Sequence, residues 1–193
     1  AEIMNYSFGF HISVRKITIS TSGVRAGIER FIDERRPYNL AISLNDTEPE
    51  KRLRNMPVER SNPFSEIAAL LEKTGIPELE IGTPAIGVEE IETMKAIVDA
   101  GFQFKTLAWC RATKKDIDAA IKSGVDRVNI SFPASDIHLM TMVKERKWVL
   151  QTMKELISYA TGFFDQVAVG AQDASRADES FLADMALQAS RCE

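Results

Sequence analysis

Short apolar runs alternate with helical patterns along most of the chain. Four segments repeat one rhythm, in which a small residue and a glycine end a helical pattern and a β-prone run follows. These segments begin at Thr74, Ala100, Ser123 and Thr161. Glycine suits a helix end because it takes a positive φ without a Cβ clash, and the following runs are too short for helices. The rhythm therefore predicts four strands, each reached from a helix.

Helical patterns fill the intervals between these runs. Apolar residues recur at helical spacing, as at Ile91, Met94 and Ile97. Thr113 and Ser175 each stand three residues before an aspartate, which is the spacing of a capping box. The sequence therefore predicts helix N-termini at both positions.

Two further β-like runs, at 16–21 and 39–44, flank a helical segment at 28–36, and Pro57–Phe64 reads as a long loop. Strands alternating with helices predict an α/β fold with a parallel sheet. Right-handed crossovers should place consecutive strands side by side. We therefore expect parallel βα units that form a partial or TIM-barrel-like sheet of about six strands. A doubly wound sheet, with a reversal of strand order, is the alternative.

Composition narrows the class of protein. The 193 residues are 45% apolar and 27% charged, with a net charge of −4. These values are ordinary for a soluble domain and give no electrostatic footprint for nucleic acid or an acidic membrane. No apolar run approaches the length of a membrane span. The two cysteines form no disulfide or metal-binding pattern, which fits a cytoplasmic location for a natural protein.

Reactive side chains of parallel α/β folds gather where the strands end. The predicted strand ends are polar, and Arg111 could bind a carboxylate or phosphate through its planar fork. His138 is the best single candidate for acid–base chemistry, because imidazole titrates near neutral pH. The alternative is that these residues cap helices and bind loop backbone. With only His11 and His138 and no HxH pair, no metal site is expected.

The first part of the chain resembles radical-SAM ribosomal-RNA adenine methyltransferases. The resemblance lies in the runs 8–23, 40–45 and 54–57. It implies that Ser20, Ser43, Leu44 and Asn45 are vestigial S-adenosylmethionine positions. Asn45 replaces the family's usual histidine, and the CxxxCxxC loop that holds the iron–sulfur cluster is absent. Radical chemistry needs that cluster and is therefore not expected.

The second part, about residues 66–190, resembles homocitrate synthases and the wider isopropylmalate-synthase and HMG-CoA-lyase barrel family. The resemblance lies in the runs 75–87, 107–111, 131–138 and 170–178. It implies vestigial catalytic positions at Glu80, Arg111, Ser135 and His138, which line a 2-oxo-acid site in the family. The family's first strand and its HxH metal pair are absent, so no cofactor is expected.

The two resemblances together predict one α/β domain over residues 1–193, built from fragments 1–64 and 65–193. The expected function is that of an engineered or recombined chimeric barrel fragment, a scaffold without an intact active site and so without enzymatic activity. One alternative is residual binding of a small anion, either S-adenosylmethionine or a 2-oxo acid. The other is an acyl transferase of the homocitrate synthase type, active only after assembly with the missing elements.

An open sheet of this kind would leave two edge strands with unpaired backbone groups. We therefore expect self-association into a homo-oligomer through the open sheet edges. No partnership with nucleic acid or membrane is expected. The location is cytoplasmic if the chain is natural, and the chain is recombinant otherwise.

Overall fold

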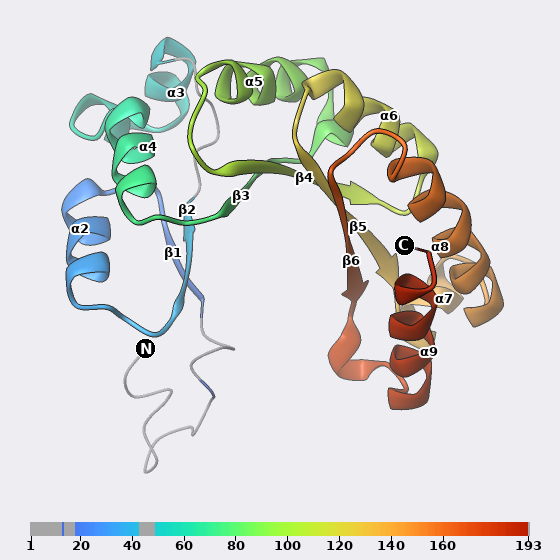
Figure 1. Ribbon diagram of the computed structural model, residues 1–193. Coiled ribbons are helices and arrows are strands. Elements are labelled where there is room, and N and C mark those ends of the chain that lie inside the picture. The colour runs from blue at the N-terminus through green and yellow to red at the C-terminus, as the bar shows by residue number, and fades with distance from the viewer. Residues whose placement is uncertain (1–12, 14–17, 43–48, 193) are drawn as a thin grey trace. The chain divides into compact units, whose positions relative to one another are not determined.

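The computed structural model describes residues 13, 18–42 and 49–192 (Figure 1). The chain divides into two compact units, Ala1–Ile76 and Pro77–Glu193. The predicted junction between residues 64 and 65 falls inside the first unit, at the start of a helix.

The first unit combines a short parallel sheet with helices. Its described elements are β1 (Thr18–Thr21), α2 (Arg25–Asp33), β2 (Asn39–Ile42), α3 (Pro49–Asn55), η2 (Pro57–Arg60) and α4 (Phe64–Lys73). β1 pairs with β2 in parallel, as the sequence predicts. The loop predicted at Pro57–Phe64 is partly wrong, because its first four residues form the 3₁₀ helix η2. Proline at the first position suits such a helix, since its missing N–H has no partner there anyway.

A buried ion pair lies at the centre of the first unit. The Arg52 side chain is fully buried and pairs with Glu59, whose side chain is 7% exposed. The Arg52 guanidinium also donates to the carbonyl oxygens of Ser22, at 3.1 Å, and Asn62, at 3.3 Å. Glu59 accepts a further bond of 3.1 Å from the backbone N–H of Phe64. The pair therefore joins the end of β1 to α3, η2 and the start of α4.

The second unit is a regular run of βα units. Its described elements are β3 (Glu78–Gly82), η3 (Pro84–Ile86), α5 (Val88–Asp99), β4 (Lys105–Arg111), α6 (Lys114–Ser123), β5 (Arg127–Pro133), α7 (Asp136–Thr141), α8 (Arg146–Ala160), β6 (Gln166–Gln172), η4 (Ala174–Arg176) and α9 (Glu179–Ser190). All four strands are parallel, in the order β3-β4-β5-β6. Helices α5, α6 and α8 lie along one side of this sheet (Figure 1).

This strand order decides between the two predicted architectures. Every strand of the second unit pairs with its neighbour in the sequence, so this sheet has no reversal of strand order. A doubly wound sheet would require one. The α/β class with parallel, barrel-like βα units is thus confirmed, with the six described strands divided between a sheet of two and a sheet of four.

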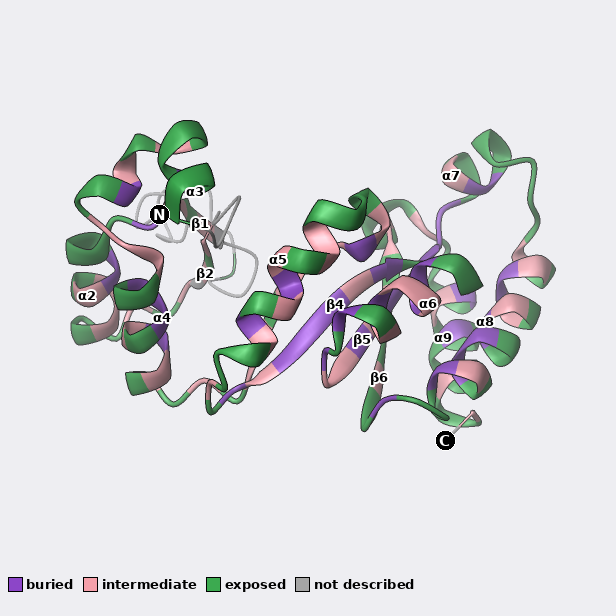
Figure 2. Ribbon diagram, turned by 90° about the horizontal axis from the view of Figure 1, so that it is seen from above, coloured by how far each residue is buried: buried purple, intermediate pink, exposed green. Residues whose placement is uncertain are grey.

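The core of the second unit lies between the sheet and its helices (Figure 2). β5 contributes Val128, Ile130 and Phe132, and α8 contributes Val149 and Met153, all with exposures of 0%. Because successive side chains of a strand point to opposite faces, the residues between these apolar positions of β5 face away from the helices.

One of the two predicted helix caps is correct. The Thr113 hydroxyl accepts the backbone N–H of Asp116 at 3.2 Å, so α6 begins as predicted. The cap predicted at Ser175 is wrong, because Ser175 lies within η4 and α9 begins at Glu179. Asp178 is the cap there, and its carboxylate accepts the N–H of Phe181 at 3.1 Å. An aspartate can cap a helix as well as a serine can, so the pattern did not distinguish the two.

The two cysteines should differ sharply in reactivity. Cys110 is fully buried in β4, and burial, together with the negative charges of Asp116 and Glu80, raises the pKa of its thiol to about 12. Cys192 is only half-buried. Because the thiolate is the reactive form, we expect Cys110 to react with a disulfide reagent at least about 100-fold more slowly than Cys192 at mildly alkaline pH. A thiol titration of the native chain measures both rates.

Two controls test this expectation. The Cys192→Ser variant should keep only the slow phase, and both thiols of the wild-type chain should react at similar rates in denaturant. Two equally fast native thiols would contradict the buried position of Cys110.

Candidate functional site

Four residues of the second unit meet on the sheet face that points away from the helices. Glu80 of β3 lies near enough to Asn129 of β5, across β4, for the Asn129 side chain to affect the pKa of the Glu80 carboxyl. A Cβ built on Gly170 of β6 would lie 3.1 Å from the Ser131 Oγ and 3.2 Å from the Asn129 Oδ1. The glycine therefore leaves room above two polar side chains of the neighbouring strand. We call Glu80, Asn129, Ser131 and Gly170 the inner-face cluster.

The electrostatics of the inner-face cluster favour proton donation. Partial burial raises the pKa of the Glu80 carboxyl above its ordinary value, although the nearby Asn129 side chain opposes the shift. The Asn129 Oδ1 is buried and has no hydrogen-bond partner among the described residues. Buried polar atoms are usually hydrogen-bonded, so this oxygen can accept a hydrogen bond from a group outside the described residues.

A second polar group lies at the strand ends, where β5 and β6 finish. The Ser135 Oγ donates to the Asp173 Oδ2 at 2.5 Å and accepts the backbone N–H of His138 at 3.1 Å. Arg176 donates from Nε to the Asp173 Oδ1 at 2.7 Å. The bonds from Arg176 and Ser135 lower the pKa of the Asp173 carboxyl, and the charge of His138 lowers it further. Ser135, His138, Asp173 and Arg176 form what we call the rim cluster.

Arg111, which the sequence suggests as an anion-binding residue, is held by a carboxylate of its own chain. Its guanidinium donates to both oxygens of Asp116, at 2.8 and 2.9 Å. The Asp116 side chain is 1% exposed, whereas that of Arg111 is 58% exposed. The fork of Arg111 thus joins the end of β4 to the start of α6.

The structure groups the predicted catalytic positions in three places. Ser135 and His138 come together in the rim cluster, Glu80 lies in the inner-face cluster, and Arg111 lies with Asp116. Five further polar residues of these groups were not among the predicted catalytic positions: Asn129, Ser131, Asp173, Arg176 and Asp116. The alternation of residues along β5 could have placed Asn129 and Ser131 on one face, since they lie two positions apart.

The predicted S-adenosylmethionine positions lie in the first unit. Ser20 is exposed on β1. Ser43, Leu44 and Asn45 lie outside the described residues, so their role stays a prediction.

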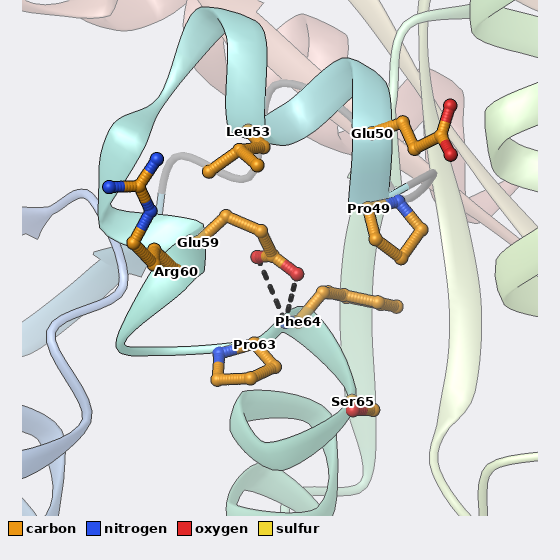
Figure 3. A pocket seen from close by; sticks show the side chains of 8 residues that line it. All are labelled: Pro49, Glu50, Leu53, Glu59, Arg60, Pro63, Phe64 and Ser65. Carbon is orange, nitrogen blue, oxygen red and sulfur yellow. Dashed lines mark hydrogen bonds between the residues drawn. The ribbon is translucent and has the colours of Figure 1, made fainter.

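The first unit also contains a pocket of about 420 Å³ (Figure 3). It is lined by Pro49, Glu50, Leu53, Glu59, Arg60, Pro63, Phe64 and Ser65. The Glu59 carboxylate in its wall is already bonded to Arg52 and to the N–H of Phe64. The Glu59 carboxylate thus serves the fold of the first unit.

Within residues 13, 18–42 and 49–192, no three His, Cys, Asp or Glu side chains are grouped so that they could hold a metal ion. In the same part of the chain, no helix has the length and apolar character needed to cross a bilayer.

Comparison with known proteins points to one family. The family described as HMGL-like matches residues 59–192. Homocitrate synthase 1 of Nostoc sp. (strain PCC 7120) is 44% identical over 124 residues, which cover 64% of this chain and 33% of that protein. 2-Isopropylmalate synthase 2 of Caldanaerobacter subterraneus subsp. tengcongensis is 40% identical, with 65% and 33% covered. The chain spans about one third of the length of these two relatives.

Two further comparisons complete the picture. Homocitrate synthase subunit alpha of Clostridium pasteurianum is 42% identical over 118 residues, which cover 61% of this chain and 44% of that subunit. A solved radical SAM methyltransferase from Sphaerobacter thermophilus covers 89% of this chain and 45% of its own, with 14% identity and a TM-score of 0.38. At so low a TM-score, neither a shared fold nor shared chemistry follows. The resemblance of residues 8–60 to radical-SAM enzymes stays a prediction.

Proposed function

Because this chain belongs to the HMGL-like family over residues 59–192, we propose that it forms part of an acyl transferase of the homocitrate synthase type. In such a reaction an acyl thioester condenses with the carbonyl group of a 2-oxo acid. The observation that carries the proposal is the inner-face cluster, which lies on a sheet within the family match. There the unpaired Asn129 Oδ1 and the Ser131 hydroxyl lie beside Gly170.

The chemistry of the inner-face cluster suits a 2-oxo acid. A Glu80 carboxyl with a raised pKa keeps its proton to higher pH, so it can donate a hydrogen bond to a carbonyl or carboxylate oxygen. Ser131 offers a hydroxyl on the same face, and Asn129 offers an oxygen for a hydroxyl or N–H donor. These groups would bind and orient the substrate, and Glu80 would hold a proton near the carbonyl oxygen.

The rim cluster would hold the other end of the substrate. Arg176 bonds Asp173 through Nε, and its side chain is 61% exposed. Its Nη groups can then receive a substrate carboxylate. The Ser135–Asp173 bond fixes the first turn of α7, which carries His138. Since the chain spans about one third of its relatives, we propose that condensation needs assembly with further barrel elements.

Binding of 2-oxoglutarate tests the proposal directly. Isothermal calorimetry on the purified chain should show one site, and Gly170→Ala should weaken binding by at least about tenfold because its methyl group would crowd Ser131 and Asn129. Gly27→Ala is the matched control, because a Cβ there meets no atom within 4 Å. Absence of any heat at millimolar 2-oxoglutarate, or equal binding by both variants, would overturn the proposal.

A second candidate is the scaffold without an intact active site, assembled from parts of two families. The specific observation that favours it is the start of the family match at residue 59, which leaves the preceding segment outside. This candidate predicts no thermal stabilisation by 2-oxoglutarate or S-adenosylmethionine. Formation of homocitrate from acetyl-CoA by the chain, alone or with added barrel elements, would eliminate it.

A further inference from the structure

Arg146 stands at the start of α8 and contacts residues of two other helices. Its guanidinium donates to both oxygens of Asp136, the first residue of α7, at 2.8 and 2.6 Å. Its Nη1 lies 3.7 Å from the Oδ1 of Asp178, the residue that caps α9. The guanidinium also lies over the Phe181 ring, 5.2 Å from the ring centroid. One side chain of α8 thus contacts the beginnings of α7 and α9.

Both carboxylates that Arg146 contacts lie beside the rim cluster in the sequence. Asp136 directly follows Ser135 on the loop after β5. Asp178 stands two residues after Arg176 on the loop after β6. The rim cluster joins these two loops through the hydrogen bond between its serine and its aspartate. A movement of either loop would therefore disturb that bond, and Arg146 fastens both loops to α8.

The place of Arg146 is unfavourable for α8 itself. Arg146 is the first residue of this helix, where the partial positive charge of the helix dipole repels a cation. The first turn of α8 contains no acidic residue, and the side chain of its N-cap, Glu145, makes no capping bond. The carboxylates of the neighbouring loops therefore explain a cation at this position better than the helix that carries it.

We propose that Arg146 is a positioning residue, which fixes the two loops of the rim cluster against α8. Its planar fork holds Asp136 through two parallel hydrogen bonds, a geometry that sets orientation as well as distance. Isolated surface ion pairs contribute little to stability, whereas bidentate pairs within a network of charges contribute more. A role in substrate binding rests on the proposed function, in which the rim cluster receives the substrate carboxylate.

The exposure of the three charged side chains separates this role from a general stabilising one. Arg146 is 38% exposed, Asp136 60% and Asp178 45%. Solvent screens charges at such exposures, so their contribution to the stability of the whole unit is small. We therefore expect the loss of Arg146 to loosen the loops of the rim cluster and to leave the buried core of the second unit intact.

Hydrogen exchange followed by ¹⁵N NMR tests the proposal without a substrate. The His138 N–H donates to Ser135 and the Arg176 Nε–H donates to Asp173, so these two protons report on the two loops. In Arg146→Met both should exchange at least about fivefold faster, because the loops open more often. Arg146→Lys should lie between this variant and the wild type, since an ammonium keeps the charge but lacks the fork.

Lys147→Met is the matched control. Lys147 is the next residue of α8 and is exposed, so its replacement removes the same charge from the same helical turn. This variant should leave both exchange rates unchanged. The amide of Met153, which is buried on α8, serves as the internal reference and should not change in any variant. Asp136→Asn should also speed exchange, and combining it with Arg146→Met should add little to the effect of Arg146→Met alone.

Calorimetry with 2-oxoglutarate supplies the functional readout. Arg146→Met should weaken binding by at least about threefold, because the rim cluster is less well fixed. Exchange rates at His138 and Arg176 that stay unchanged in Arg146→Met, or that rise only as much as that of Met153, would overturn the proposal. Full affinity in a variant whose loops exchange faster would contradict a positioning role in the same way. A wild-type chain that binds no 2-oxoglutarate would instead overturn the proposed function, while the exchange rates still decide the role of Arg146.

Discussion

Replacing Arg52 with methionine should lower the free energy of unfolding of the first unit by about 3–5 kcal/mol. The guanidinium is fully buried, and its removal leaves the Glu59 carboxylate buried without its cation. It also removes the donors to the carbonyls of Ser22 and Asn62. An unpaired buried charge costs far more than the pair itself contributes, because the carboxylate has lost its water. Urea unfolding, with hydrogen exchange of the α4 amides, measures the loss.

A matched arginine and a double variant complete this experiment. Arg54 lies on the same helix but is exposed, so Arg54→Met should change stability by less than about 0.5 kcal/mol. Arg52→Met combined with Glu59→Leu should be less destabilised than the sum of the single changes, because no charge is then left buried. Equal losses in the free energy of unfolding for Arg52→Met and Arg54→Met would contradict the stabilising role of the Arg52–Glu59 pair.

Replacing Asp116 with alanine should destabilise the second unit by about 2–4 kcal/mol. The buried carboxylate accepts the N–H, Nε and Nη2 of Arg111 and the hydroxyl of Thr113, all between 2.8 and 3.0 Å. The change frees the end of β4 from the start of α6. Asp184→Ala, on the exposed side of α9, is the control and should have little effect. Thermal unfolding followed by Trp fluorescence reports on this unit, which contains both tryptophans.

The same variant should alter the response to acid. Burial alone would raise the pKa of Asp116, but the hydrogen bonds from Arg111 and Thr113 outweigh burial and lower it below 3.8. A lowered pKa contributes stability above the unfolded value, and this contribution disappears as the pH falls through the folded value. Wild-type stability should therefore fall below about pH 4 more steeply than that of Asp116→Ala. If the stability of the two proteins falls equally steeply with pH, the hydrogen bonds between Arg111 and Asp116 do not cause the acid sensitivity.

The repeating units could be predicted because their signals are local. Glycines 75, 101 and 124 follow helices and take positive φ, as the repeat predicts, and each precedes a strand, whereas Gly162 of the fourth segment does not take a positive φ. The long loop at Pro57–Phe64 failed as a prediction because prolines mark both loops and the first turns of helices. The cap at Ser175 failed because two residues with capping side chains lay within one turn of each other.

The grouping of site residues could not be predicted to the same degree. Glu80 reaches Asn129 across an intervening strand, which depends on the register of three strands. The Arg111 guanidinium is held by hydrogen bonds to Asp116. The capping pattern identifies Asp116 only as a residue of the first helical turn. Gly170 matters because of the side chains of the neighbouring strand, and nothing in its own segment shows this. Tertiary register, more than residue type, thus decides which polar groups meet.

The strictly consecutive strand order of the second unit has a consequence for synthesis. Each of β4, β5 and β6 can pair with its predecessor as soon as it leaves the ribosome, because that partner has already been synthesised. Contacts between neighbours in sequence close short loops and form quickly. The described strands β4, β5 and β6 can therefore join the growing sheet one after another, in the order in which they are synthesised.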